Sequence, residues 1–181
     1  MLDVRDRSCL VVGGGPVATR KAAGLVAEGA RVVVVAPEMS TVLRTMDVEL
    51  VCRPYRSEDV VGRWLVIAAT GFGEVNQQVF DDATRAGVWA NCADEPERCA
   101  FILPAVHRQG PITVSVSTAG ASPSLAQWLR DRLAASLPAG IEEIAAELAL
   151  RRQQLAARGE STEGRNWRAE IDALIDERGA R

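Results

Sequence analysis

The sequence predicts an α/β protein with an open parallel sheet, followed by a smaller region of strands and helices. Two observations support this prediction. Up to residue 92, short apolar runs alternate with helical or polar segments, a pattern typical of parallel strands joined by helices. After Pro96 the pattern changes to two strand-like runs and three amphipathic stretches, which indicates a second structural region.

The first predicted elements are a strand, a glycine turn, a helix and a second strand. Residues 8–13 (SCLVVG) and 31–38 (RVVVVAPE) are apolar runs of the kind that form buried parallel strands. Between them, Gly13, Gly15 and Ala18 have the spacing G-x-G-x-x-A at the start of a helical pattern. A strand, glycine turn, helix and strand in about thirty residues is the fingerprint of a Rossmann-type, dinucleotide-binding sheet.

Three more strands complete the predicted sheet. We expect them at 48–55 (VELVCRPY), 64–70 (WLVIAAT) and 88–92 (VWANC), with a helix over 76–87 (NQQVFDDATRAG) that ends at a glycine. Open sheets of this kind bind their ligands at the carboxyl ends of the strands. We therefore look for the functional residues in the loops that follow these runs.

The second region begins with two strand-like runs, 99–105 (CAFILPA) and 111–118 (PITVSVST), which the turn-like HRQG separates. Ser122 is then a favourable N-cap and Pro123 suits the first turn of a helix. Two further helices are predicted over 140–157 and 163–178, after a break at LPAG. Leucines recur at every fourth position in the first of these three helices, which indicates a core or a dimer interface; they are Leu125, Leu129, Leu133 and Leu137.

The composition excludes several classes of protein. The net charge is −3, and no apolar run approaches the roughly 20 residues that span a bilayer, so we expect neither a nucleic-acid partner nor a membrane. Four cysteines without a C-x-x-C pair favour reduced thiols and a cytoplasmic protein. The single lysine, Lys21, and the single tyrosine, Tyr55, cannot form the Tyr-x-x-x-Lys pair of short-chain dehydrogenases. The one histidine, His107, lies in the turn-like segment, so we expect it at the surface.

The glycine turn and an acid further along the chain together predict NAD as the cofactor. Gly13 permits the tight turn, and Gly15 lets the backbone approach a pyrophosphate at the helix N-terminus. Glu38 lies 25 residues beyond Gly13, just after the second predicted strand. There an acid can accept hydrogen bonds from the ribose hydroxyls of NAD, whereas an arginine would have favoured NADP. The alternative for Glu38 is an exposed loop acid.

The stretch NCADEPERC, residues 91–99, holds three acids between two cysteines. A zinc site is excluded because structural zinc needs four ligands in paired spacings, and these are lacking here. We expect Cys92 and Cys99 to be buried instead. Asp94 directly follows the last predicted strand, at the carboxyl edge of the sheet, where it would act as a catalytic or substrate-positioning group or, alternatively, as a cap of a helix or turn.

Four segments, read in order, resemble the family of precorrin-2 dehydrogenases and sirohydrochlorin ferrochelatases, which forms the amino-terminal half of siroheme synthase. They are CLVVGGGPVATRKAAGLVAEGARVVVVAPE, WLVIAAT followed by VNQQV, NCADEPERCAFILPA, and ITVSVSTAGASPSLAQWLRDRL. The resemblance covers roughly residues 3–150 and implies NAD-dependent oxidation of precorrin-2 to sirohydrochlorin. In many members it also implies insertion of Fe(II), and the metal could equally be Co(II). The competing interpretation is a non-catalytic NAD-sensing regulatory module.

The resemblance also implies a domain organisation and a set of site residues. We expect a Rossmann domain over 1–97, a dimerisation segment over 98–139, a small helical domain over 140–181, and a homodimer. The cofactor residues are Gly13, Gly14, Gly15, Pro16, Val17, Pro37 and Glu38, to which we add Thr70 at the end of the fourth predicted strand. The implied catalytic residue is Asp94, and Ser117 and Thr118 lie where the family has its serine pair. Because the carboxylates of precorrin-2 need local donors, we add Ser122 and Arg98 as substrate residues, with Arg108 and Arg130 as alternatives to Arg98.

The chain departs from the family in one loop. Members often have two serines followed by two glycines where this chain has Ser117, Thr118, Ala119 and Gly120. Thr118 keeps the hydroxyl, so we expect substrate binding to survive. Ser122 is assigned to an anion site at the helix N-terminus, although ordinary N-capping explains it equally well.

Overall fold

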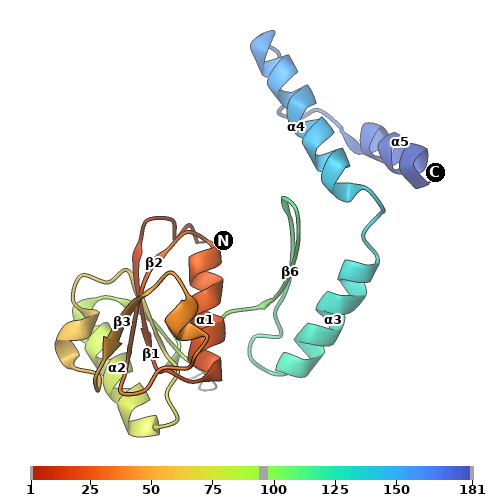
Figure 1. Ribbon diagram of the computed structural model, residues 1–181. Helices are drawn as coiled ribbons and strands as arrows, with labels where there is room; N and C mark the ends of the chain where they lie inside the picture. Colours follow the sequence, from red (N-terminus) through yellow and green to blue (C-terminus); the bar gives the residue numbers. More distant parts are fainter. Residues whose placement is uncertain (1, 94–97, 180–181) are drawn as a thin grey trace. The chain divides into compact units, whose positions relative to one another are not determined.

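The computed structural model describes residues 2–93 and 98–179. The chain divides into two compact units, Met1–Ile102 and Leu103–Arg181, which are shown in Figure 1. The three predicted domains, 1–97, 98–139 and 140–181, stay a prediction.

The first unit is built on a five-stranded parallel sheet, and this confirms the predicted fold class. Its strands lie in the order β3-β2-β1-β4-β5, and every neighbouring pair is parallel. The chain runs outward from β1 to β3 and then crosses back to β4, so the strand order reverses between β1 and β4. The strands are β1 (Ser8–Val12), β2 (Arg31–Ala36), β3 (Glu49–Cys52), β4 (Leu65–Ala68) and β5 (Trp89–Cys92).

Two α-helices cover opposite faces of this sheet. Alternate side chains of a strand point to opposite faces, and in β1 the buried Val11 packs with helix α1 (Pro16–Ala27), while Leu10 packs with helix α2 (Gly73–Ala86). Two short 3-10 helices, η1 (Leu43–Thr45) and η2 (Ser57–Val60), interrupt the loops around β3. The hydrophobic core of the unit therefore consists of two layers, one on each side of the sheet.

The second unit consists of a hairpin and three helices. Strands β6 (Ala105–Gln109) and β7 (Ile112–Val116) pair antiparallel, and helix α3 (Pro123–Ala135) packs against the hairpin. Helices α4 (Ile141–Ala157) and α5 (Arg168–Gly179) follow. The predicted break at LPAG is confirmed, since it lies between α3 and α4.

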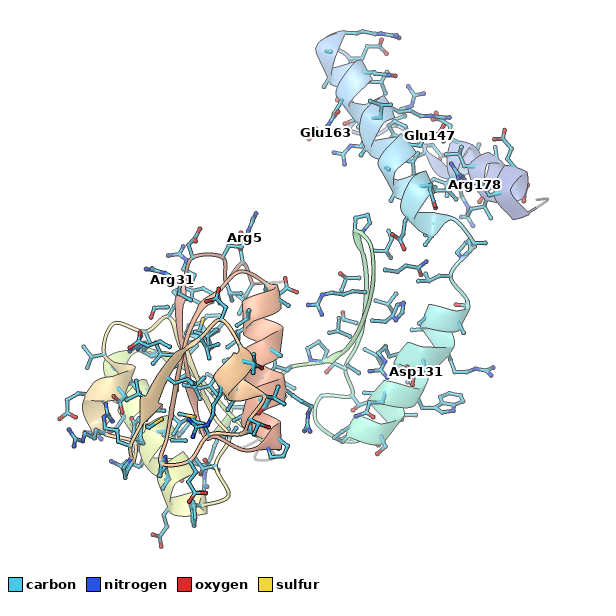
Figure 2. All side chains as sticks on the ribbon, in the orientation of Figure 1. Arg5, Arg31, Asp131, Glu147, Glu163 and Arg178 are labelled. Carbon is cyan, nitrogen blue, oxygen red and sulfur yellow. The ribbon has the colours of Figure 1, made fainter. Side chains whose placement is uncertain are left out.

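Ion pairs join the last two helices. Glu147 of α4 and Arg178 of α5 lie close to one another in Figure 2, with 3.7 Å between the guanidinium and the carboxylate. Arg151 of α4 donates to Glu147 at 2.5 Å and to Glu170 of α5 at 3.3 Å. Ile144 of α4 and Leu174 of α5 are buried. None of the described helices is both long enough and apolar enough to cross a membrane.

Two predictions about residues 99–110 were wrong. Residues 99–105 do not form a strand: Cys99 makes a single bridge to Asn91, and Ile102 and Leu103 are exposed. Most of HRQG is not a turn: His107, Arg108 and Gln109 belong to β6, with His107 half-buried opposite Val114, and Gly110 alone of the four lies in the turn. Pairing with β7 places the three polar residues in a strand, a non-local effect that their local sequence does not show.

Candidate functional site

A pocket of about 860 Å³ lies at the carboxyl ends of the strands in the first unit. Its volume falls within the range of about 300–1,000 Å³ that is usual for small-molecule sites. The loops after β1, β2, β3, β4 and β5 all contribute to it. It is lined by every residue that the sequence assigns to the cofactor, namely Gly13, Gly14, Gly15, Pro16, Val17, Pro37, Glu38 and Thr70.

The first two glycines of the turn are required by close backbone contacts. Gly13 has a φ of 131°, and a Cβ atom there would lie 2.3 Å from the carbonyl oxygen of Ala69. A Cβ on Gly14 would lie 1.8 Å from the carbonyl oxygen of Glu38. The loops after β1, β2 and β4 can therefore meet only because both residues lack a side chain.

Gly15 is different, because a Cβ there would meet nothing within 4 Å. It is the N-cap of α1, and no side chain caps that helix end. The N–H groups of the first turn and the positive end of the helix dipole thus face an open space. An uncapped helix N-terminus beside open space is the geometry that holds a pyrophosphate in dinucleotide-binding sheets.

A serine that the sequence analysis missed ties the Glu38 loop to the glycine turn. The Ser40 backbone N–H donates to the Gly14 carbonyl at 2.9 Å, and its hydroxyl lies 3.0 Å from the Thr19 hydroxyl on α1. The same Ser40 oxygen accepts from the Leu43 N–H at 3.2 Å. Exposed Glu38 is therefore carried on a loop that is held at a fixed place beside the turn.

Thr70 acts within the loop after β4. Its hydroxyl donates to the side-chain oxygen of Asn76 at 2.7 Å, and its N–H donates to the same atom at 3.2 Å. Asn76 is only 4% exposed and belongs to α2. The Thr70 hydroxyl thus fixes the start of α2 at the pocket. Asn76 was not predicted as a site residue.

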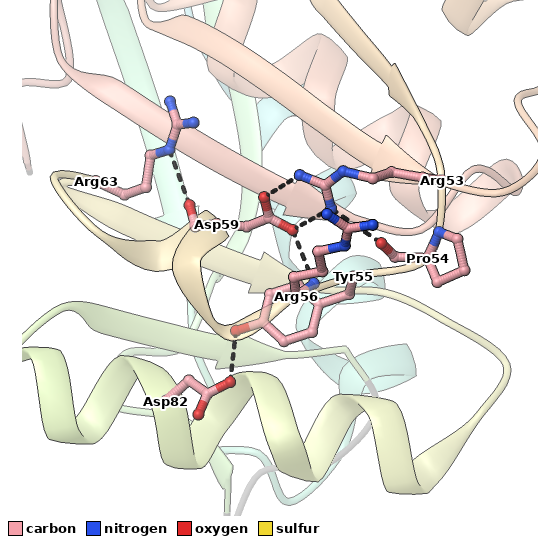
Figure 3. A network of polar contacts seen from close by, with 7 residues as sticks. All are labelled: Arg53, Pro54, Tyr55, Arg56, Asp59, Arg63 and Asp82. Carbon is pink, nitrogen blue, oxygen red and sulfur yellow. Dashed lines mark hydrogen bonds and ion pairs between the residues drawn. The ribbon is translucent and has the colours of Figure 1, made fainter.

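The loop after β3 closes the remaining side of the pocket and carries a polar network, which Figure 3 shows. The Tyr55 hydroxyl donates to Asp82 of α2 at 2.9 Å. Arg53 donates to both carboxylate oxygens of Asp59, at 2.8 and 2.6 Å. That guanidinium lowers the pKa of Asp59 below its ordinary value, while burial, followed by the Asp82 carboxylate, raises the pKa of Tyr55.

Asp94, the predicted catalytic residue, lies outside the described residues. Ala93, which precedes it, lines the pocket, and its N–H donates to Ala68 at 2.8 Å. On the other side, the Asn91 side chain donates to the Phe101 carbonyl at 2.9 Å and to the Cys99 sulfur at 3.3 Å. These bonds tie residues 99–101 to β5.

The cysteines on either side of Asp94 lie in the first unit and act as packing residues. Cys92 is buried, as predicted, and Cys99 is half-buried. Their thiols donate to backbone carbonyls, Cys92 to Asn76 at 3.6 Å and Cys99 to Cys92 at 3.3 Å.

Comparison with known proteins identifies the family of this chain. Residues 1–105 match the family model described as "Putative NAD(P)-binding", and residues 109–136 match the one described as "Sirohaem biosynthesis protein central". The chain belongs to the precorrin-2 dehydrogenase and siroheme synthase family. The resemblance on which the sequence analysis relied is thereby confirmed.

Two relatives and one solved structure illustrate the match. The chain is 39% identical to the siroheme synthase of Thioalkalivibrio sulfidiphilus over 180 residues, which are 96% of this chain and 37% of that protein. It is 38% identical to siroheme synthase 3 of Aeromonas hydrophila over 157 residues, or 84% and 34%. The structure of SirC, a precorrin-2 dehydrogenase, superposes with a TM-score of 0.74 at 25% identity, covering 98% of this chain and 86% of SirC. The chain thus spans about a third of the curated relatives.

Internal hydrogen bonds stabilise the loop over residues 117–122, in which this chain departs from the family pattern. The Thr118 hydroxyl donates to the Ser122 carbonyl at 3.0 Å and accepts from the Ser122 N–H at 3.1 Å. The Ser122 hydroxyl caps α3 by accepting from the Leu125 N–H at 3.2 Å, which confirms the predicted N-cap. Ala119 has a φ of 52°, a left-handed conformation that favours glycine. The substrate roles assigned to Ser117, Thr118 and Ser122 stay a prediction.

The predicted substrate residues lie in different units. Arg98 belongs to the first unit and is half-buried. Ser117, Thr118 and Ser122 belong to the second. The role of Arg98 in substrate binding also stays a prediction.

Proposed function

We propose that this chain oxidises precorrin-2 to sirohydrochlorin with NAD as the oxidant. The single observation that carries the proposal is the glycine turn. Gly13 and Gly14 bring three loops together, and Gly15 leaves open space at the N-terminus of α1. The similarity to SirC, a precorrin-2 dehydrogenase, gives this dinucleotide pocket its substrate class.

The reaction removes one hydride and one proton from the macrocycle, so two electrons leave. Bound NAD supplies the hydride acceptor. The chain must hold the cofactor, exclude water and accept the proton. The glycine turn and Glu38 would hold the cofactor. We assign Glu38 to the ribose hydroxyls because Ser40 ties the Glu38 loop to the turn. This assignment favours NAD over NADP.

We assign the proton to the carboxylate of Asp94. Asp94 follows β5 in the sequence, and β5 lies on the side of the β1–β4 crossover on which the nicotinamide half of a dinucleotide binds in sheets of this type. Ala93 lining the pocket supports this assignment. The carboxylates of precorrin-2 need positive or N–H donors, and for these we propose Arg98 and the loop from Ser117 to Ser122.

We further propose that the chain works as a homodimer. The described buried apolar side chains of the second unit are few, namely Ala126, Ile144 and Leu174. A two-stranded hairpin is marginal by itself, and β6 and β7 have half-buried or exposed residues throughout. Three large apolar side chains of α3 are about half exposed: Leu125, Trp128 and Leu133. A second copy would bury them.

Insertion of Fe(II) or Co(II) into sirohydrochlorin is the second activity that we propose, because the relatives are siroheme synthases. Loss of pyrrole N–H protons is required for this step, so Asp94 would serve again as the base. The metal enters here as a substrate. The cytoplasmic location predicted from the sequence stays a prediction.

The test is a turnover assay under anaerobic conditions with freshly generated precorrin-2 and NAD. We expect NADH and the sirohydrochlorin spectrum to appear together, and siroheme to form when Fe(II) is added. Asp94→Asn should lower kcat for oxidation by about a hundredfold or more, the usual size of a general-base contribution, while the Kd for NAD stays unchanged. An NAD-sensing module would instead bind NAD without turning over substrate.

A further inference from the structure

The pocket has an apolar wall that phosphate and ribose binding do not explain. Pro54 and Tyr55 line it from the loop after β3, and Phe72 and Val75 line it from the beginning of α2. Phe72 is 73% exposed, an unusual state for a large apolar side chain in the body of a domain. A wall of this composition suits a flat, weakly polar ring.

The order of the strands indicates which part of a dinucleotide meets this wall. β3 is the edge strand beside β2, and the loop after β2 carries Glu38. In a sheet of this type the adenosine half lies on the side of the ribose-binding acid, and the nicotinamide half lies on the other side of the crossover. The loop after β3 is therefore beside the adenine and remote from the reacting carbon.

The Tyr55 hydroxyl is already engaged with the protein. It donates to Asp82 at 2.9 Å, as Figure 3 shows, and Asp82 is 4% exposed and also pairs with Arg85. The Tyr55 hydroxyl is protonated at neutral pH, as for any tyrosine, and burial, followed by Asp82, raises its pKa further, so the hydroxyl remains a donor. What Tyr55 offers to a ligand is its aromatic ring.

The backbone on both sides of Tyr55 is held as well. Arg53 bonds Asp59 through two nitrogens and donates to the Pro54 carbonyl at 3.0 Å. Asp59 also accepts from the Arg56 N–H at 2.9 Å. The ring is thus fixed before any ligand arrives, and little conformational entropy is lost on binding.

We propose that the Tyr55 ring, positioned by Asp82, is the surface on which the adenine base of NAD packs. The inference rests on the proposed NAD binding. Tyr55 would contact the adenosine half directly, Asp82 is its positioning residue, and neither takes part in hydride or proton transfer. Stacking of a base on an aromatic ring changes affinity by about tenfold or more.

The test is calorimetric titration of the full chain with three probes: NAD, ADP-ribose and nicotinamide mononucleotide. For Tyr55→Leu, which keeps an apolar side chain but removes the ring, we expect NAD and ADP-ribose to bind about tenfold more weakly. Nicotinamide mononucleotide, which lacks the adenosine half, should bind as it does to the wild type. Tyr55→Phe keeps the ring but removes the hydrogen bond that positions it, so the affinities for ADP-ribose and NAD should both fall about threefold.

A matched control is Val61→Ala, which removes an exposed apolar side chain that does not line the pocket; its affinities should equal those of the wild type. Unchanged ADP-ribose affinity in Tyr55→Leu would overturn the inference, and so would an equal loss for nicotinamide mononucleotide, which would show a general disturbance. If Tyr55→Leu does not fold, Tyr55→Phe provides the test. A threefold loss of affinity for NAD and ADP-ribose, with none for nicotinamide mononucleotide, would support the inference, and its absence would overturn it. If the wild type did not bind NAD at all, that result would instead contradict the proposed function.

Discussion

Gly15 differs from the two glycines before it in what surrounds its α-carbon. Side chains at Gly13 and Gly14 would collide with backbone carbonyls at 2.3 and 1.8 Å, whereas one at Gly15 would meet open space. The backbone of Gly15 itself, with φ −86° and ψ −171°, is open to any residue. Its lack of a side chain therefore serves a ligand, while that of its neighbours serves the fold.

This contrast predicts the effect of adding one methyl group. Gly15→Ala should weaken NAD binding at least tenfold, because the Cβ enters the space in which the pyrophosphate would lie. The unfolding free energy should change little. Gly24→Ala is the matched control, since its Cβ also meets nothing within 4 Å but lies on α1 away from the turn; it should leave NAD affinity unchanged. Calorimetric titration with NAD and thermal unfolding of both variants test this prediction. A Gly15→Ala variant that binds NAD as tightly as the wild type would contradict it.

The second residue-scale prediction concerns Ala119. Its φ of 52° is costly for any side chain, whereas glycine adopts it freely. Ala119→Gly should raise the unfolding free energy by about 0.5–1 kcal/mol in urea titrations. Ala121→Gly, in the same loop, should not stabilise the protein. A loss of stability in Ala119→Gly would show that the alanine methyl makes a contact worth more than the strain.

At the scale of elements, the sequence predicted the parallel sheet well and the hairpin poorly. β1, β2, β4 and β5 have nearly continuous buried side chains, so an apolar run alone marks them. β6 reads AVHRQ and is half-buried, and its pairing with β7 is a non-local property that its composition does not show.

The same reason explains the site residues that the sequence analysis missed. Ser40 makes its side-chain hydrogen bond with Thr19, which is 21 positions away, and Asp82 accepts one from Tyr55, which is 27 positions away. Such partners come together only in the folded chain, and no local sequence motif predicts them. The glycine turn was predictable because its function requires a fixed spacing within one short segment.

The loop around η2 gives a prediction about pH. Arg53 lowers the pKa of Asp59 below its ordinary 3.8. A carboxyl whose pKa is lower in the folded state contributes stability above its unfolded pKa, about 3.9, and loses it as pH falls through the folded value. Asp59→Asn should therefore cost about 2 kcal/mol at pH 7, and the difference from wild type should shrink below about pH 4.

Urea unfolding of both proteins between pH 3 and pH 7 measures this difference; the pH range is about that of carboxyl titration. Glu58→Gln, a neighbouring exposed acid of the same 3-10 helix, is the control and should follow the wild-type profile. A difference between Asp59→Asn and wild type that is constant with pH would contradict the assigned cause.

At the scale of the whole molecule, the two units differ in how they are stabilised. The first has a core on both faces of its sheet. The second, as far as it is described, buries few apolar side chains and leaves Trp128 57% exposed on α3. We therefore expect this unit to gain stability from a partner surface, as the proposed homodimer would provide.

The proposed homodimer predicts the consequence of a charge on α3. Trp128→Glu should shift the wild-type dimer to monomer in analytical ultracentrifugation and should lower its melting temperature, because a charge would be desolvated in the interface. Val61→Glu, an exposed position in the first unit, should leave the dimer intact. A wild-type chain that sediments as a monomer, or a Trp128→Glu variant that remains a dimer, would be incompatible with this interface.

If this pocket holds the oxidant for precorrin-2, the reaction must consume NAD and precorrin-2 in equal amounts. Purified protein, precorrin-2 and NAD are mixed without oxygen, and NADH and sirohydrochlorin are quantified in the same samples over time. We predict that the two products appear at equal rates, one for one, and that Gly15→Ala slows both equally. Sirohydrochlorin that forms without NADH, or no sirohydrochlorin with NAD present, would contradict the account.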